Sequence, residues 1–95
     1  MDLFDALHGR RSIRHFAAGT VDDDVVRTIL SAAMAAPSAG NEQPWHFIVV
    51  RDPAILTALS AAHPYAEMVQ HASLAVIVCA DMKTVKHRDY WPADC

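Results

Sequence analysis

The chain has 95 residues, of which 53% are hydrophobic and 20% are charged; this composition excludes an intrinsically disordered protein. The length suffices for one small domain and not for two. The net charge of −3 at pH 7 gives no field that attracts nucleic acid, so no nucleic-acid partner is expected. A complete soluble domain of this size would need fewer apolar residues, and we therefore expect apolar surface that meets a second subunit or further polypeptide.

The sequence predicts a soluble, cytoplasmic protein without a membrane partner. Residues 1–5 contain no basic residue and lead into no long apolar run, so a signal peptide is not expected. The longest uninterrupted apolar run, 74–80, is far too short to span a bilayer. The two cysteines do not resemble a disulfide framework, and the six histidines lack zinc-ligand spacing, so no metal site is predicted.

The first part of the chain predicts two helices. Residues 2–8 form a short one, with Asp2 as its N-cap and Gly9 able to end it. The second helix spans 22–36 at most, because Pro37 disfavours helical geometry in the residue before it. Its apolar residues follow the i, i+3, i+4, i+7 pattern: Val26, Ile29, Leu30 and Ala33.

Two strands are predicted further along the chain. Residues 45–51 are rich in Trp, Phe, Ile and Val, and residues 73–80 are apolar enough for a central strand. Two strands do not make a stable sheet alone, so we expect residues 1–95 to be a fragment or one piece of a longer protein. The other predicted elements are a helix that begins at Asp52-Pro53 and stops before His63-Pro64, a helical stretch over 65–71, and the first turn of a helix at 90–95.

A basic segment follows the first helix and contains Arg10, Arg11, Ser12 and Arg14. A phosphomonoester needs charge-assisted donors from several directions, which arginine forks and a serine hydroxyl supply. The segment is therefore a candidate phosphate site. The alternative is a solvated basic loop after a helix.

The loop between the second helix and the first strand is the other candidate. Prolines stiffen its ends, and small residues between them let backbone approach a flat ligand closely. The amides of Asn41 and Gln43 carry donors and acceptors that suit the edge of a flavin pyrimidine ring. The alternative is an ordinary helix-to-strand loop with Gly and Asn as turn formers.

Together the two segments resemble a known family. Arg-Arg-Ser-Ile-Arg at 10–14, followed by Pro-Ser-Ala-Gly-Asn-Glu-Gln-Pro-Trp-His-Phe at 37–47, is similar to the FMN-dependent nitroreductases. The resemblance extends over essentially the whole chain, including Asp52-Pro53 and the strand that ends in Cys79-Ala80-Asp81. It implies an α+β nitroreductase-like fold, with a central, mainly antiparallel sheet flanked by helices, and an obligate homodimer in the complete protein.

The resemblance also implies the cofactors, FMN and NAD(P)H as co-substrate, and the residues that hold the flavin. FMN would lie at the subunit interface, and no side chain would act as a catalytic acid, base or nucleophile. Gln43 would either touch the flavin or brace the loop. The phosphate would be held by Arg10, Arg11, Ser12 and Arg14, and the ring would be lined from the other subunit by Pro37, Ser38, Ala39 and Asn41.

The implied activity is NAD(P)H-dependent reduction of nitroaromatics, quinones or similar small electron-poor acceptors by a ping-pong mechanism. Two alternatives stay open. One is another chemistry on the same fold, such as dehalogenation, flavin fragmentation or azoline oxidation. The other is a flavin-binding module without turnover. The second half of the family's domain, which supplies a long dimer helix and a late basic residue for the phosphate, lies outside these residues.

Overall fold

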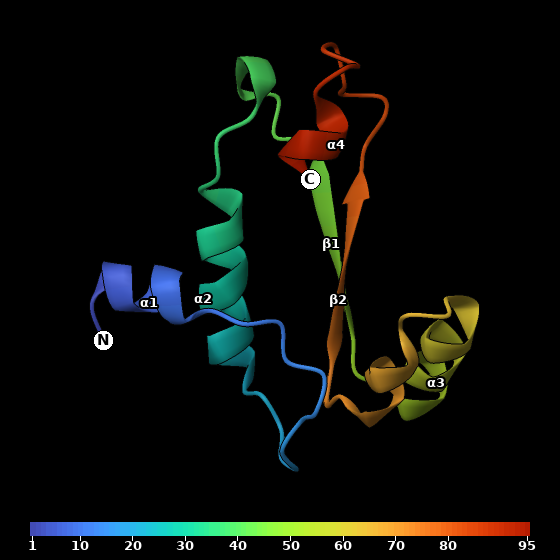
Figure 1. The fold of residues 1–95 in the computed structure, drawn as a ribbon. Coiled ribbons are helices and arrows are strands. Elements are labelled where there is room, and N and C mark those ends of the chain that lie inside the picture. Colours follow the sequence, from blue (N-terminus) through green and yellow to red (C-terminus); the bar gives the residue numbers. More distant parts are fainter.

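The computed structural model describes residues 1–95 as helices around a two-stranded sheet (Figure 1). The order of the expected helices and strands is confirmed, with ends that differ by one or two residues. One element was not expected, a short 3₁₀ turn inside the loop that follows the second helix. The elements are α1 (Leu3–Gly9), α2 (Asp23–Met34), η1 (Ala39–Asn41), β1 (Trp45–Val50), α3 (Pro53–Ala62), η2 (Glu67–His71), β2 (Ala75–Ala80) and α4 (Trp91–Asp94).

Aspartate side chains fix the starts of two helices. Asp2 accepts a hydrogen bond of 2.8 Å from the backbone N–H of Asp5 in α1. Asp52 accepts one of 2.9 Å from the N–H of Ala54 in α3. Asp22 occupies the same position before α2, but its side chain makes no capping hydrogen bond. At the beginning of α2, the carboxylates of Asp23 and Asp24 in the first turn instead interact favourably with the helix dipole.

The two strands pair antiparallel, as expected, with Trp45 opposite Ala80 and Val50 opposite Ala75. The carbonyl of Pro44 accepts the N–H of Asp81 at 2.7 Å, which extends the pairing beyond the end of the strands. Residues directly opposite one another share a face of the sheet. One face carries Trp45, Phe47, Val49, Val76, Val78 and Ala80, and the other carries His46, Ile48, Val50, Ala75, Ile77 and Cys79.

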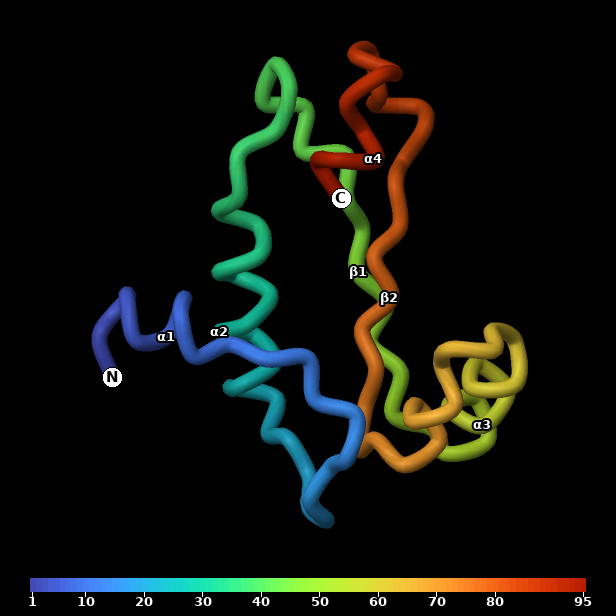
Figure 2. The backbone as a smooth tube through the Cα atoms, viewed as in Figure 1, coloured from blue at the N-terminus to red at the C-terminus, as the bar shows by residue number.

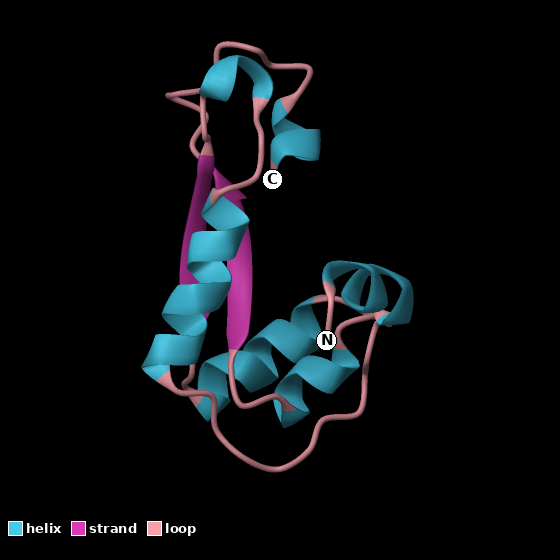
Figure 3. Cartoon of the chain, turned by 90° about the vertical axis from the view of Figure 1, so that its left-hand side faces the viewer, coloured by secondary structure: helices cyan, strands magenta, loops and turns pink.

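The core of the chain is small. Helix α2 runs along the length of the strands, while α3 and η2 lie at one end of the sheet and α4 at the other (Figures 2 and 3). Neither α1 nor α2 has a buried residue, and Ile29 on the apolar face of α2 is 55% exposed. The five buried residues are Pro44, Trp45, Val50, Leu56 and Val85.

The exposed surface is larger than a folded monomer of this mass would have. It measures 7588 Å², against about 5,400 Å² expected for a compact protein of the same mass. The radius of gyration of 15.3 Å also exceeds the roughly 12 Å expected for this length. The excess of roughly 2,000 Å² is comparable to the area that an obligate assembly buries. Both sheet faces and the apolar face of α2 thus keep apolar side chains exposed.

A helix that crosses a bilayer needs about 20 residues, most of them apolar. None of the helices has the length and apolar character needed to cross one.

Candidate functional site

The basic segment follows α1 on an exposed path (Figure 1), and the turned view shows that it runs to one side of α2 (Figure 3). The ion pairs of the chain are His46 with Asp81 and Arg51 with Asp23, so the arginines of the segment have no acidic partner. The guanidinium groups of Arg10 and Arg14 and the hydroxyl of Ser12 also make no hydrogen bond within the chain. Their donors are free for an anion, as a phosphate site requires.

Arg11 is placed differently from its neighbours. Its Nη1 atom donates to the carbonyl of His8 at 2.9 Å and to that of Arg10 at 2.8 Å. Because His8 lies in the last turn of α1, the cation satisfies a carbonyl that the helix leaves without an intrahelical partner. One nitrogen of Arg11 is therefore engaged with α1, and the strongest free donors of the segment belong to Arg10 and Arg14.

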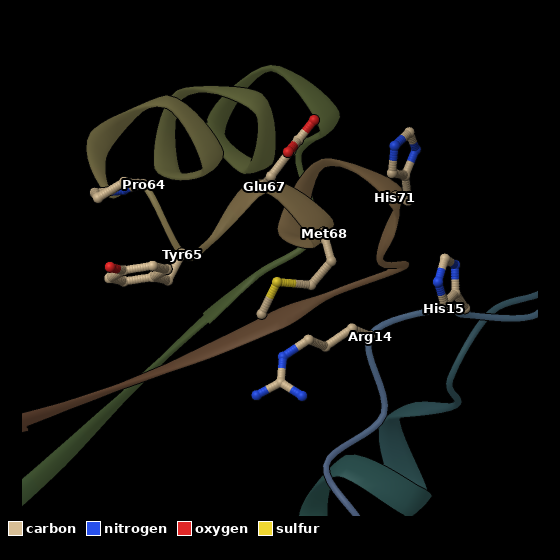
Figure 4. Close-up of a pocket in the computed structure, with 7 residues that line it drawn as sticks. All are labelled: Arg14, His15, Pro64, Tyr65, Glu67, Met68 and His71. Atoms are coloured by element: carbon tan, nitrogen blue, oxygen red, sulfur yellow. The ribbon is translucent and has the colours of Figure 1, made fainter.

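Arg14 also lines an open pocket of about 670 Å³, a size typical of small-molecule sites. Figure 4 shows its guanidinium and the Met68 thioether reaching in from opposite walls. No sequence signal pointed to the second wall, because residues 64–71 contain no motif and meet Arg14 only through the fold. The lining residues are Arg14, His15, Pro64, Tyr65, Glu67, Met68 and His71.

The loop after α2 follows an unusual backbone path. Gly40, Asn41 and Gln43 have φ values of 60°, 55° and 50°, in the left-handed region that non-glycine residues seldom adopt. The hydroxyl of Ser38 accepts the N–H of Gln43 at 3.0 Å across the turn. The backbone of Gln43 therefore braces the loop, while its side chain stays exposed.

Two carboxylates tie this loop to the last part of the chain. Glu42 accepts the backbone N–H groups of Lys86 at 2.6 Å and His87 at 3.0 Å through Oε1. Asp94 accepts the N–H of Ala39 at 3.2 Å and 3.3 Å through its two oxygens. Sequence reasoning missed both anchors, because neither carboxylate belongs to a recognisable motif and both act on residues far away in sequence.

An ionisable pair lies where the strands end near this loop. The N–H of Lys83 donates to Asp81 at 3.0 Å, and this bond lowers the pKa of Asp81, with a smaller contribution from His46 at 3.4 Å. Burial raises the pKa of the Cys95 thiol, and the charge of Asp94 adds to the effect. No three His, Cys, Asp or Glu side chains gather in a way that could hold a metal ion.

The basic segment and the loop do not form one site within the chain. The loop follows the C-terminal end of α2, whereas the basic segment follows α1 and lies nearer the level of the first turns of α2 (Figure 1). The view turned about the vertical axis keeps this separation along the helix (Figure 3).

The structure thus defines an α+β protein with free anion donors in the segment after α1 and a loop of small residues after α2 that two carboxylates hold in place. The model of the nitroreductase family matches residues 7–92 of the sequence. The chain belongs to the nitroreductase family, and the resemblance inferred from the two segments is confirmed.

Individual relatives agree with this assignment. The chain is 50% identical over 90 residues to an Archaeoglobus fulgidus protein provisionally named NADH dehydrogenase/NAD(P)H nitroreductase, covering 94% of this chain and 52% of the relative. A Clostridium acetobutylicum crystal structure, provisionally named an NADH oxidase, superposes with a TM-score of 0.92 and 40% identity over 95% of this chain and 54% of the other.

A third relative was solved with a cofactor. A provisionally named nitroreductase from Desulfovibrio desulfuricans, crystallised in complex with FMN, gives a TM-score of 0.88 and 33% identity over 96% of this chain and 54% of the other. These likenesses confirm the expected nitroreductase-like α+β fold. The chain spans about half the length of the relatives it matches.

Proposed function

We propose that residues 1–95 form the N-terminal part of a single nitroreductase-like domain in an FMN-dependent oxidoreductase. The complete protein uses NAD(P)H to reduce small electron-poor acceptors, such as nitroaromatics or quinones, in a ping-pong cycle. The observation that carries this proposal is the free donor set of the basic segment, in a chain of this family. Surface arginines without a partner are suited to an anion that the chain itself does not supply.

The basic segment fits the phosphate of FMN. Arg10 and Arg14 offer two planar forks and Ser12 a hydroxyl, and none of these donors is engaged within the chain. Arg14 reaches into a pocket of a size that suits a small molecule. Arg11 contributes through the nitrogens that α1 leaves free. We assign these four residues to the phosphate.

The loop after α2 fits a planar ring. Pro37, Ser38, Ala39 and Asn41 present little side-chain bulk, and Asp94 and Glu42 hold the backbone in place. We assign these four residues to the isoalloxazine. Because the two assigned segments lie apart in both views of the chain (Figures 1 and 3), the proposal places each flavin between two subunits of a homodimer. The large exposed apolar surface supports such an assembly.

The chemistry itself belongs to the cofactor. When bound, FMN takes hydride from the nicotinamide and delivers electrons to the acceptor. The side chains of this chain bind the phosphate, hold the ring and exclude water from it. None of them is assigned as a catalytic acid, base or nucleophile.

Two other functions use the same flavin site. Dehalogenation, flavin fragmentation and azoline oxidation need the same cofactor. The relative matched over 94% of this chain carries the name NADH dehydrogenase/NAD(P)H nitroreductase, which favours NAD(P)H-dependent reduction. A flavin-binding module without turnover would show the same phosphate and ring contacts, and only an activity measurement separates it from an enzyme.

The test uses the complete protein loaded with FMN. Oxidation of NADH and NADPH is followed at 340 nm, about where reduced nicotinamide absorbs, with a nitroaromatic or a quinone as acceptor. We expect acceptor-dependent oxidation, with parallel lines in the double-reciprocal plots as a ping-pong cycle requires. A protein that binds no FMN would overturn the proposal. Tight FMN binding without NAD(P)H oxidation would identify a flavin-binding module instead.

A further inference from the structure

Glu42 joins two segments that lie far apart in the sequence. A single carboxylate oxygen, Oε1, accepts two consecutive backbone N–H groups, from Lys86 at 2.6 Å and from His87 at 3.0 Å. Hydrogen bonds to an ionised carboxylate are shorter and roughly twice as strong as neutral ones. The Glu42 side chain is therefore a clamp between the loop after α2 and the segment 84–87.

A second contact brings the same segments together. A Cβ atom built on Gly40 would lie 2.7 Å from Nε2 of His87, so the imidazole of His87 rests directly against the loop backbone. Gly40 also has a φ of 60°, which a glycine adopts without the steric penalty of a side chain. The clamp thus holds the loop where the His87 side chain and the backbone of Gly40 come close together.

The backbone and the carboxylate around Glu42 adopt an arrangement that is unfavourable in free energy. Asn41 and Gln43, on either side of Glu42, are non-glycine residues in the left-handed region. The second carboxylate oxygen of Glu42, Oε2, is shielded from solvent and has no hydrogen-bond partner. Strained backbone and unpaired buried oxygens persist where the surroundings over-determine them, and such places are often functional.

We propose that Glu42 is a positioning residue for the flavin ring. By tying the loop to residues 84–87, its carboxylate fixes the path of Pro37 to Asn41 before the flavin arrives. A loop that is ordered in advance binds more tightly, because less conformational freedom is lost on binding. This inference rests on the proposed function of the loop, and it adds a residue that makes no contact with the ring itself.

The test compares three variants of the complete protein. Glu42→Ala removes the clamp, Glu42→Gln keeps an acceptor oxygen without the charge, and Asp24→Ala removes an exposed carboxylate on α2 as a control. FMN affinity is measured by fluorescence titration. We expect Glu42→Ala to weaken FMN binding by about tenfold or more, the loss of at least one charge-assisted bond. Glu42→Gln should fall between this variant and the wild type, and Asp24→Ala should match the wild type.

A further measurement separates positioning from general stability. Visible circular dichroism at saturating FMN reports the asymmetry of the ring environment, and we expect it to decrease in Glu42→Ala while the far-ultraviolet circular dichroism of the flavin-free protein is retained. Wild-type affinity and an unchanged visible spectrum in Glu42→Ala would overturn the role of Glu42 while leaving the proposed function intact. A wild-type protein that binds no FMN would overturn the proposed function itself.

Glu42→Gln carries the test if Glu42→Ala does not fold. In that variant we expect the amides of Lys86 and His87 to exchange hydrogen faster than in the wild type, together with weaker FMN binding. Unchanged exchange at both amides, or faster exchange with wild-type FMN affinity, would overturn the inference.

Discussion

The arginines of the basic segment differ in what the chain leaves them free to do. Arg11 is drawn back to the carbonyls of His8 and Arg10 at the end of α1. The guanidinium groups of Arg10 and Arg14 make neither a hydrogen bond nor an ion pair within the chain. Because a guanidinium that is already hydrogen-bonded has less to gain from a new acceptor, the free pair should dominate phosphate binding.

Arg10→Ala in the complete protein tests this assignment. Loss of one charge-assisted contact should weaken FMN binding by about tenfold or more, measured by fluorescence titration. Arg27→Ala serves as the control, since Arg27 is exposed on α2 and makes no hydrogen bond or ion pair in the chain. Equal FMN affinity in the two variants would show that Arg10 does not bind the phosphate.

Ala39→Trp tests the ring-lining loop. The side chain of Ala39 is half-buried in a loop held by Asp94 and Glu42, and an indole there should collide with the flavin or with the acceptor stacked on it. We expect the helical circular dichroism and the dimer to be retained, because a loop tolerates change better than a core. Bound FMN or most acceptor turnover should be lost. Ala61→Trp, at an exposed position of α3, is the control, and equal activity in the two variants would refute the assignment.

At the scale of the elements, aspartates that precede two helices differ in whether they cap them. Asp52 caps α3 with a bond of 2.9 Å to Ala54, whereas Asp22 makes no capping bond to α2. We expect Asp52→Ala to lower the free energy of unfolding of the complete protein by about 1 kcal/mol, and Asp22→Ala to lower it by less. Urea denaturation measures both. A larger loss for Asp22→Ala would contradict the capping geometry.

Helix α2 has an apolar face that this chain covers only in part, since Val26, Leu30 and Ala33 are half-buried and Ile29 is exposed. Ile29 is 55% exposed here, although the spacing of apolar residues predicts that it faces a core. We expect Ile29→Asp to destabilise the complete protein by at least about 2 kcal/mol, because a charge would be buried without a partner. Ser31→Asp, on the opposite side of the same helix, should have little effect. Urea denaturation and light scattering compare the two, and similar stabilities would show that the face of α2 stays exposed.

The elements were predictable because their signals are local. Asp52-Pro53 marks the start of α3 and Pro37 limits α2, and each acts on neighbouring residues. The apolar strands were equally visible. By contrast, the clamp of Glu42 acts on residues 44 and 45 positions away, and the wall opposite Arg14 comes from the η2 region. Neither the periodicity nor the spacing of residues indicates such contacts, so this part of the site could be identified only from the three-dimensional fold.

At the scale of the whole molecule, the apolar residues predict the helices and strands but do not predict which surfaces pack against them. The exposed surface measures 7588 Å², and the chain spans about half the length of the relatives it matches. Both observations are consistent with our proposal that further polypeptide packs on the exposed apolar surface. The two candidate segments lie apart in both views of the chain. In our proposal the flavin site belongs to the homodimer, to which each copy of this chain brings one segment.

A crystal structure of the complete protein grown with FMN tests this shared site most directly. The predicted result is a homodimer in which Arg10, Ser12 and Arg14 of one subunit hold the phosphate while residues 37–39 of the other subunit lie beside the isoalloxazine. Both segments of a single subunit on the same flavin would contradict the shared site. A flavin that neither segment touches would contradict the assignment of this chain as a flavin-binding half.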